Sequence, residues 1–335
     1  MASTKAMIVP HVARHRARRD RWINTWQRYG TLMALTLLVA FNLAFTPGFR
    51  STQAWSTNLT QVAPIVIVAT GMTLVIATGG IDLSVGSLMA IAGTLAPLVF
   101  QASIWPLNQQ AVGTSMAIVI SVAAAGLFGW FNGWLITSRH LQPIIATLVL
   151  FIAGRGIAQA LTNGGHIEIN RPDFQYIAFG RPGGVPLQVI LMLVVSLSAI
   201  GVMKFTTMGR YIVAIGGSRS ASWLAGVPVT AATWFVYILS GSLAGIAGLI
   251  EVAIISSADP NFLGLNMELD AIAAVAVGGT PLTGGRAMVF DTLLGALFIQ
   301  LIRYTLLSHG VPYAAAQIVN AALILAAVLL QRLGS

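Results

Sequence analysis

Long apolar runs with almost no charge constrain this chain most strongly. Runs of about twenty residues recur along it, for example at 113–137, 187–205 and 229–255. A helix needs about 20 apolar residues to cross the roughly 30 Å hydrocarbon core of a bilayer. Of the 335 residues, 56% are hydrophobic and 8% are charged, so the chain lacks the polar residues with which a soluble domain covers its surface. The sequence therefore predicts an all-α polytopic membrane protein.

About ten transmembrane segments are predicted, and this even number returns both chain ends to one side. The segment 268–279 is too short to cross alone and ends in glycines, so we expect a half-helix or re-entrant element that other helices shield. Residues 29–335 are predicted to form a single transmembrane domain. The ten segments are 30–46, 60–78, 83–101, 113–137, 143–162, 187–205, 229–255, 268–279, 288–307 and 313–331.

The basic residues predict the orientation of these segments. The sequence pI is about 10.8, but most of the excess charge lies in residues 1–28, which carry seven Lys or Arg and one Asp directly before an apolar run. Basic residues concentrate on the cytoplasmic side of membrane proteins, so residues 1–28 are predicted to be a cytoplasmic tail. Arg303 lies inside a span near its outer end, where its side chain could reach the interface. Six further bases fall on the side of the tail: Arg139, Lys204, Arg210, Arg219, Arg286 and Arg332.

Outside the tail, the chain has no second basic stripe with interleaved aromatic residues, so the charge does not indicate nucleic-acid binding. We expect the membrane lipid, and not a nucleic acid, to be the surface that this chain contacts.

A segment that is interrupted by glycines occurs twice in similar form. Residues 77–86 read ATGGIDLSVG and residues 276–285 read AVGGTPLTGG, and six of the ten positions pair as the same or nearly the same residue. A helix broken at membrane depth persists only where protein or a water-filled cavity covers its backbone. Paired broken segments in two halves of a chain indicate an internal repeat beside a transport pathway. Asp82 has a second interpretation, which is compatible with the first, as the N-cap of a helix starting at Leu83.

No pattern of residues indicates an enzyme. The phosphate-binding pattern G-x-x-x-x-G-K-[ST] is absent, and neither Lys5 nor Lys204 follows a glycine. The five histidines are scattered without an HExxH pattern, there is no cysteine, and the serines in apolar segments have no neighbouring histidine. We therefore predict no catalytic residue, no metal site and no cofactor in this chain.

The segment 207–228 is polar enough to leave the membrane and carries Arg210 and Arg219 without any acid. Its small residues alternate with apolar ones, which predicts a short amphipathic helix that docks in a groove on another protein. The alternative is an ordinary interfacial loop whose bases do no more than set the topology.

Several stretches together resemble the permease subunits of bacterial sugar ABC importers of the ribose/galactose/xylose type. The sequence of residues 71–93 and the Gly-Gly-Arg at 284–286 are most similar to the galactofuranose-importer branch. The chain has Ser218 where the family usually has Asn and Ala287 where it usually has Gly, so the sugar stays open. The stretches are GMTLVIATGGIDLSVGSLMAIAG, the Asn132–Gly133 pair in GWFNGWLI, ATLVLFIAGRGIAQALTNGG, GRYIVAIGGSRSASWLAGV and MELDAIAAVAVGGTPLTGGR.

This resemblance implies a multi-pass permease of the bacterial inner (plasma) membrane, with both termini cytoplasmic, that moves a monosaccharide (a pentose or hexose, with galactofuranose as one candidate). The implied partners are a second permease, identical or different, a cytoplasmic subunit that holds ATP and Mg, and a periplasmic sugar-binding protein. Residues 207–228 become the segment that couples to the ATPase, through Gly209, Arg210, Ala214, Gly216, Gly217, Ala221 and Gly226. The predicted pathway and hinge residues are Gly79, Gly80, Asp82, Ser84, Asn132, Asp270, Gly278 and Gly279.

A proton-coupled secondary sugar transporter is the competing interpretation. Such a protein needs titratable groups within the membrane. The candidates are Asp82, Arg155, Glu251, Asp270 and Asp291.

Overall fold

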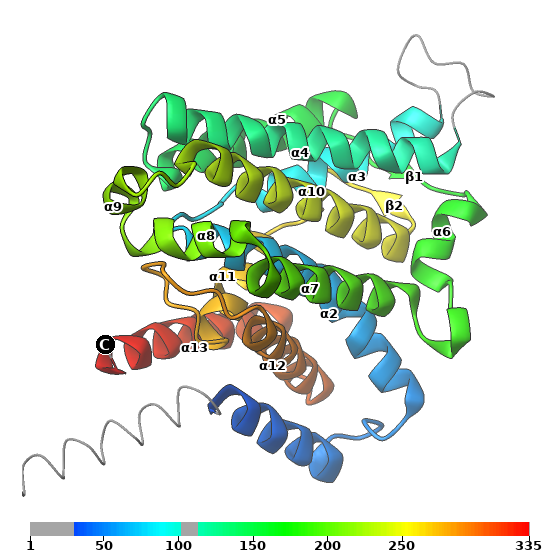
Figure 1. The fold of residues 1–335 in the computed structure, drawn as a ribbon. Helices are drawn as coiled ribbons and strands as arrows, with labels where there is room; N and C mark the ends of the chain where they lie inside the picture. Colours follow the sequence, from blue (N-terminus) through cyan, green and yellow to red (C-terminus); the bar gives the residue numbers. More distant parts are fainter. Residues whose placement is uncertain (1–29, 102–112, 335) are drawn as a thin grey trace, which may run out of the picture.

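A computed structural model describes residues 30–101 and 113–334, so the predicted tail 1–28 lies outside the described residues. The described chain is a bundle of helices with one short antiparallel strand pair, β1 (Ile167–Glu168) with β2 (Ser257–Ala258). The long helices run side by side. The short helices α8 (Thr207–Gly217) and α9 (Arg219–Leu224) lie at one end of the bundle, and the strands and α6 (Pro172–Phe179) lie at the other (Figure 1).

Among the described residues, six helices are long and apolar enough to cross a membrane. They are α2 (Thr52–Ala77), α4 (Thr114–Ser138), α5 (Pro143–Leu161), α7 (Leu187–Phe205), α10 (Val229–Ile255) and α12 (Val289–Ser308). The other predicted segments correspond to the shorter helices Gly30–Phe45, α3 (Val85–Phe100) and α11 (Met267–Val277), and to α13 (Tyr313–Gly334). The all-helical membrane architecture is therefore confirmed, whereas the count of ten spans and the internal repeat stay predictions.

Helix boundaries agree with the apolar runs except at the start of α2. This helix begins at Thr52, eight residues before the predicted start at 60, because the polar first turns continue the same helix beyond the apolar run. Ser51 caps the helix by accepting a hydrogen bond from the backbone N–H of Ala54 at 3.1 Å. The apolar run therefore predicted the buried part of α2 but not its polar first turns.

The core of the bundle lies around α2, which is buried continuously from Val62 to Ala77 and packs against α7, α10, α11 and α12. Helix α10 in turn packs against α4 with direct backbone contact. A Cβ added at Gly129 would collide with the carbonyl of Tyr237, and one added at Gly241 would collide with the carbonyl of Ala125. Small residues at such contacts let membrane helices approach closely and gain dispersion energy.

Polar side chains also join the helices across the core. Gln300 on α12 donates to Gln61 on α2 at 2.8 Å, and Thr73 on α2 donates to Thr292 on α12 at 2.9 Å. Such groups have no water to bind inside a bilayer, so each needs a partner in the protein. These pairs set the rotation of α2 against α12, because turning either helix would separate them.

The side chain of Arg303 on α12 forms an ion pair instead of extending to the interface as the sequence suggested. It donates to both carboxylate oxygens of Asp270 on α11, at 2.8 and 2.9 Å. Each of these two side chains is 17% exposed, so the pair is largely shielded. The predicted pathway residue Asp270 is therefore held in a link between α11 and α12.

Replacing Arg303 by Met is expected to destabilise the protein by about 3–5 kcal/mol, because it leaves the shielded carboxylate of Asp270 without a partner. The double variant Arg303→Met with Asp270→Leu should recover most of this loss. Arg171→Met is the control, since its pair with Asp173 is more exposed, at 31% and 54%, and should cost at most ~1 kcal/mol. Thermal unfolding in detergent measures all three variants. A double variant as unstable as Arg303→Met would contradict the assignment.

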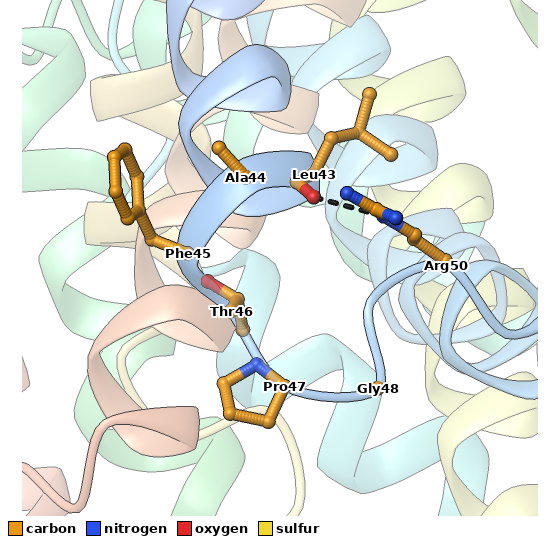
Figure 2. Close-up of a pocket in the computed structure, with 7 residues that line it drawn as sticks. All are labelled: Leu43, Ala44, Phe45, Thr46, Pro47, Gly48 and Arg50. Carbon is orange, nitrogen blue, oxygen red and sulfur yellow. Dashed lines mark hydrogen bonds between the residues drawn. The ribbon is translucent and has the colours of Figure 1, made fainter.

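A small pocket lies where the Gly30–Phe45 helix ends. It is lined by residues 43–48 and Arg50, which come from the last turn of this helix and from the connection that follows it (Figure 2). Figure 2 shows the Arg50 side chain reaching back to the carbonyl oxygen of Leu43, to which Nε donates at 3.0 Å. This contact stabilises the turn into α2, and none of the predicted site residues lines the pocket.

Candidate functional site

Both copies of the repeated phrase end a helix in the same way. Gly79 after α2 has φ of +80° and Gly279 after α11 has φ of +85°, a left-handed conformation that glycine adopts without the steric cost of a Cβ. Gly80 N–H donates to the carbonyl of Val75 at 3.2 Å, and Thr280 N–H donates to that of Val275, also at 3.2 Å. This pattern is a Schellman helix ending. The residues that the two segments share therefore encode the same local structure, a helix end at a left-handed glycine, which we call a glycine stop.

Asp82 follows the first stop and is fully buried. Its Oδ1 accepts hydrogen bonds from the Ser84 backbone N–H at 3.0 Å and from the Ser84 hydroxyl at 2.6 Å, and its Oδ2 accepts one from the Ser240 hydroxyl of α10 at 2.8 Å. Helix α3 begins at Val85, so Asp82 is not the N-cap of a helix starting at Leu83. Its carboxyl instead stabilises the turn before α3 and ties that turn to α10.

Asn132 on α4 joins this buried cluster. Its Nδ2 donates to the Ser84 hydroxyl at 2.9 Å. Tyr237 on α10 is also close, since a Cβ added at Gly80 would lie 2.5 Å from its hydroxyl oxygen. Within the described part of the chain, Asn132 Oδ1 and the Tyr237 hydroxyl are buried without a hydrogen-bond partner. We call Asp82, Ser84, Asn132, Tyr237 and Ser240 the Asp82 cluster.

The structure brings together four predicted residues, Gly80, Asp82, Ser84 and Asn132, and adds Tyr237 and Ser240, which sequence reasoning missed. The available signal was one tyrosine and two serines within the otherwise apolar stretch FVYILSGSLAG. Asp270 lies elsewhere, in its pair with Arg303. Gly278 serves helix packing, because a Cβ there would lie 2.6 Å from the carbonyl atoms of Asp291 on α12.

A second group of charges, both half-buried, holds the loop 259–266. Arg155 on α5 donates to the carbonyl oxygens of Pro260 at 2.8 Å and Leu263 at 2.5 Å. Glu251 on α10 accepts a hydrogen bond from the backbone N–H of Gly264 at 3.2 Å. Arg155 and Glu251 were candidates for a proton relay from the sequence. In the structure both are bonded to loop backbone, which gives each a structural role.

The segment 207–228 forms two helices rather than one. Ser218 lies between α8 and α9 in an extended conformation, and its hydroxyl caps α9 by accepting from Ala221 N–H at 3.3 Å. Helix α8 is amphipathic as predicted, with Ile212 and Ile215 buried. Helix α9 leaves Trp223 71% exposed and Leu224 79% exposed. These two large apolar side chains were not among the predicted coupling residues.

Three of the predicted coupling glycines serve the fold of the segment itself. A Cβ on Gly209 would collide with the backbone of Met203 on α7, and one on Gly216 would collide with the carbonyl of Ala77. Gly226 has φ of +79° in the turn after α9. The other predicted coupling residues are exposed on the surface: Arg210, Ala214, Gly217 and Ala221.

Comparisons with known proteins agree with this architecture. Residues 55–328 match the family described as the branched-chain amino acid transport system / permease component. The chain is 40% identical to the ribose import permease protein RbsC of Escherichia coli (strain K12) over 303 residues, which cover 89% of this chain and 92% of that protein. It is 39% identical to the galactofuranose transporter permease protein YtfT of the same strain, over 82% of this chain and 78% of that one.

A more distant relative is also named as a sugar import permease. The fructose import permease protein FruF of Bifidobacterium longum is 34% identical over 86% of this chain and 81% of its own length. No solved structure matches the chain significantly. The chain belongs to the family of permease components of transport systems, as a multi-pass membrane protein similar to permeases that import sugars.

Proposed function

We propose that this chain is the membrane-spanning subunit of an ATP-driven importer that moves a monosaccharide inward across the bacterial inner membrane by alternating access. The observation that carries the proposal is the similarity to sugar permeases over most of the chain, 89% in the case of RbsC. The ten predicted segments would lie in the membrane, with α11 as a half-helix held by α2 and α12. Both termini would be cytoplasmic; the C-terminal end lies at the same end of the bundle as α8 and α9 (Figure 1).

The energy must come from a partner, because the sequence contains no phosphate-binding pattern. Helices α8 and α9 are the proposed docking element for a cytoplasmic subunit that holds ATP and Mg. Trp223 and Leu224 at the end of α9 are large, apolar and more than 70% exposed. Exposed apolar side chains of this size are suited to fill a groove on a partner protein. Arg210 and Arg219 beside them keep the segment on the basic side of the membrane.

The remaining proposed partners are a second permease, identical or different, and a periplasmic sugar-binding protein. A pathway between two permeases needs only weak contacts with the sugar, because tight binding inside the membrane would slow its release. Identity to RbsC is 40% and to YtfT 39%, so these values do not separate a pentose from a hexose. A monosaccharide with five or six carbons, galactofuranose included, is the proposed substrate class.

A proton-coupled transporter is the second candidate function, and the buried carboxyl of Asp82 is the observation that favours it. All three hydrogen bonds to this carboxyl come from Ser84 and Ser240, which do not titrate, and the hydroxyl of Tyr237, the titratable neighbour in the cluster, makes no hydrogen bond to it. The structural role of Asp82 therefore accounts for its burial without proton movement.

Uptake into vesicles tests the proposal. With the ATP-binding subunit and the sugar-binding protein reconstituted, sugar uptake is expected to require ATP, and a pH gradient without ATP should give none. Omitting the binding protein is the control and should reduce uptake to the background level. Uptake driven by a pH gradient alone would overturn the importer and establish the second candidate.

A further inference from the structure

The end of α8 touches both glycine breaks at one point. A Cβ added at Gly216 would collide with the carbonyl oxygen of Ala77, the last residue of α2, and with the backbone nitrogen of Gly285. Gly285 N–H also donates to that same Ala77 carbonyl at 3.0 Å. Three chain segments that lie far apart in the sequence therefore meet here through backbone atoms.

The two breaks also touch each other at this point. A Cβ added at Gly284 would lie 2.8 Å from the nitrogen of Gly79 and 3.2 Å from the Cα of Gly216. Gly284 and Gly285 have φ of +92° and +82°, so glycine is favoured at both positions. We call the contact of Ala77, Gly79, Gly216, Gly284 and Gly285 the glycine junction.

Backbone contact matters for how a displacement spreads. Side chains at an interface can change rotamer and absorb a shift, but atoms of the main chain in direct contact cannot, and packed interiors transmit strain. Helix α8 is held in place by buried Ile212 and Ile215, and it packs against α2 and α10. A push on α8 therefore reaches the turn after α2 and the turn after α11 together.

We propose that Gly216 is a positioning residue through which the docking element moves both glycine breaks at once. One displacement of α8 then shifts the adjoining ends of α2 and α3 and of α11 and α12 in the same step. This inference rests on the proposed function, since it describes how force from the ATPase would reach the pathway. It assigns to Gly216 a role distinct from contact with the ATPase, because a Cβ at this position would meet the backbone of Ala77 and Gly285.

Gly216→Ala tests the junction, and Gly201→Ala on α7 is its control outside the docking element. Both positions are helical, so the gain in helix propensity is the same type of change at each. A Cβ at Gly201 meets nothing within 4 Å, whereas one at Gly216 strikes two backbone atoms. In vesicles that contain the whole importer, Gly216→Ala should retain ATPase binding and ATP hydrolysis but move at least about tenfold less sugar per ATP. Gly201→Ala should keep the wild-type ratio.

An unchanged ratio of sugar to ATP in Gly216→Ala, at normal assembly, would overturn the junction while leaving the importer intact. Loss of ATP dependence in the wild-type protein would instead refute the proposed function. A second measurement holds even where Gly216→Ala fails to fold. Hydrogen exchange of the wild-type complex, compared with and without a non-hydrolysable ATP analogue, should change at 76–82 and 280–286 together. A change at one break without the other would overturn the inference.

Discussion

Replacing Trp223 and Leu224 together by Ser is expected to abolish ATP-driven uptake and to release the ATP-binding subunit, while the protein stays inserted in the membrane. Both side chains are more than 70% exposed, so the free chain loses little packing. Central anchors of an interface contribute ~2 kcal/mol or more each, so losing both should weaken association by about a thousandfold. Co-purification of the ATPase with each variant measures this, alongside ATP hydrolysis stimulated by the binding protein.

A matched pair of residues at another site controls this experiment. Phe262 and Leu265 lie in the loop 259–266 and are 69% and 54% exposed. Changing both to Ser removes a similar apolar area in a loop outside α8 and α9, and the ATPase should still co-purify. Normal assembly and normal stimulation with the Trp223 and Leu224 variant would show that α9 is not the docking element.

Asp82→Ala is expected to destabilise the protein by about 3–5 kcal/mol, because hydrogen bonds to a carboxylate contribute more than neutral ones and three donors would be left without their acceptor. The donors are the N–H and hydroxyl of Ser84 and the hydroxyl of Ser240, all buried. Asp82→Asn should cost less, since it keeps the shape and one acceptor oxygen. Thermal unfolding in detergent measures both variants.

Asp173→Ala is the control for this second prediction, because Asp173 lies outside the spans with its side chain 54% exposed. The Thr114 hydroxyl and, to a lesser extent, Arg171 lower the pKa of this carboxyl, so it stays ionised at neutral pH. Losing it should cost at most ~1 kcal/mol. Asp82→Ala with stability equal to Asp173→Ala would contradict the structural role. Asp82→Asn that folds normally but loses all uptake would instead indicate a titrating carboxyl.

Local signals in the sequence were sufficient for most of the helices. The ends of α7 and α10 agree with the predicted limits, because these helices stop where the apolar run stops. The start of α2 differs, since its first turns are polar and capped by Ser51. The break at Ser218 was also missed, because a serine cap within a run of small residues does not interrupt the amphipathic pattern.

Chemistry at the candidate site was harder to predict, because a side chain's partners come from other helices. Asp82 suggested a helix cap, whereas its carboxyl is shared between its own turn and Ser240, 158 residues away. Arg303 suggested a cation at the interface, and α11 supplies Asp270 as its partner. Exposure of Trp223 and Leu224 likewise depends on which face of α9 the rest of the fold leaves open.

By itself the sequence determined that the chain is a helical membrane protein, that two segments with similar glycine-containing sequences end helices, and that the pattern G-x-x-x-x-G-K-[ST] does not occur. These follow from composition and from the conformational freedom of glycine, which act within a few residues. Tertiary structure alone decided that the first stop, the Gly284–Gly285 turn and the end of α8 meet in the glycine junction, and that the Asp82 cluster joins α4 and α10 to the turn before α3. Such contacts depend on how helices distant in sequence pack. The sequence of one helix indicates where a neighbour packs only through a small or polar residue on the contacting face.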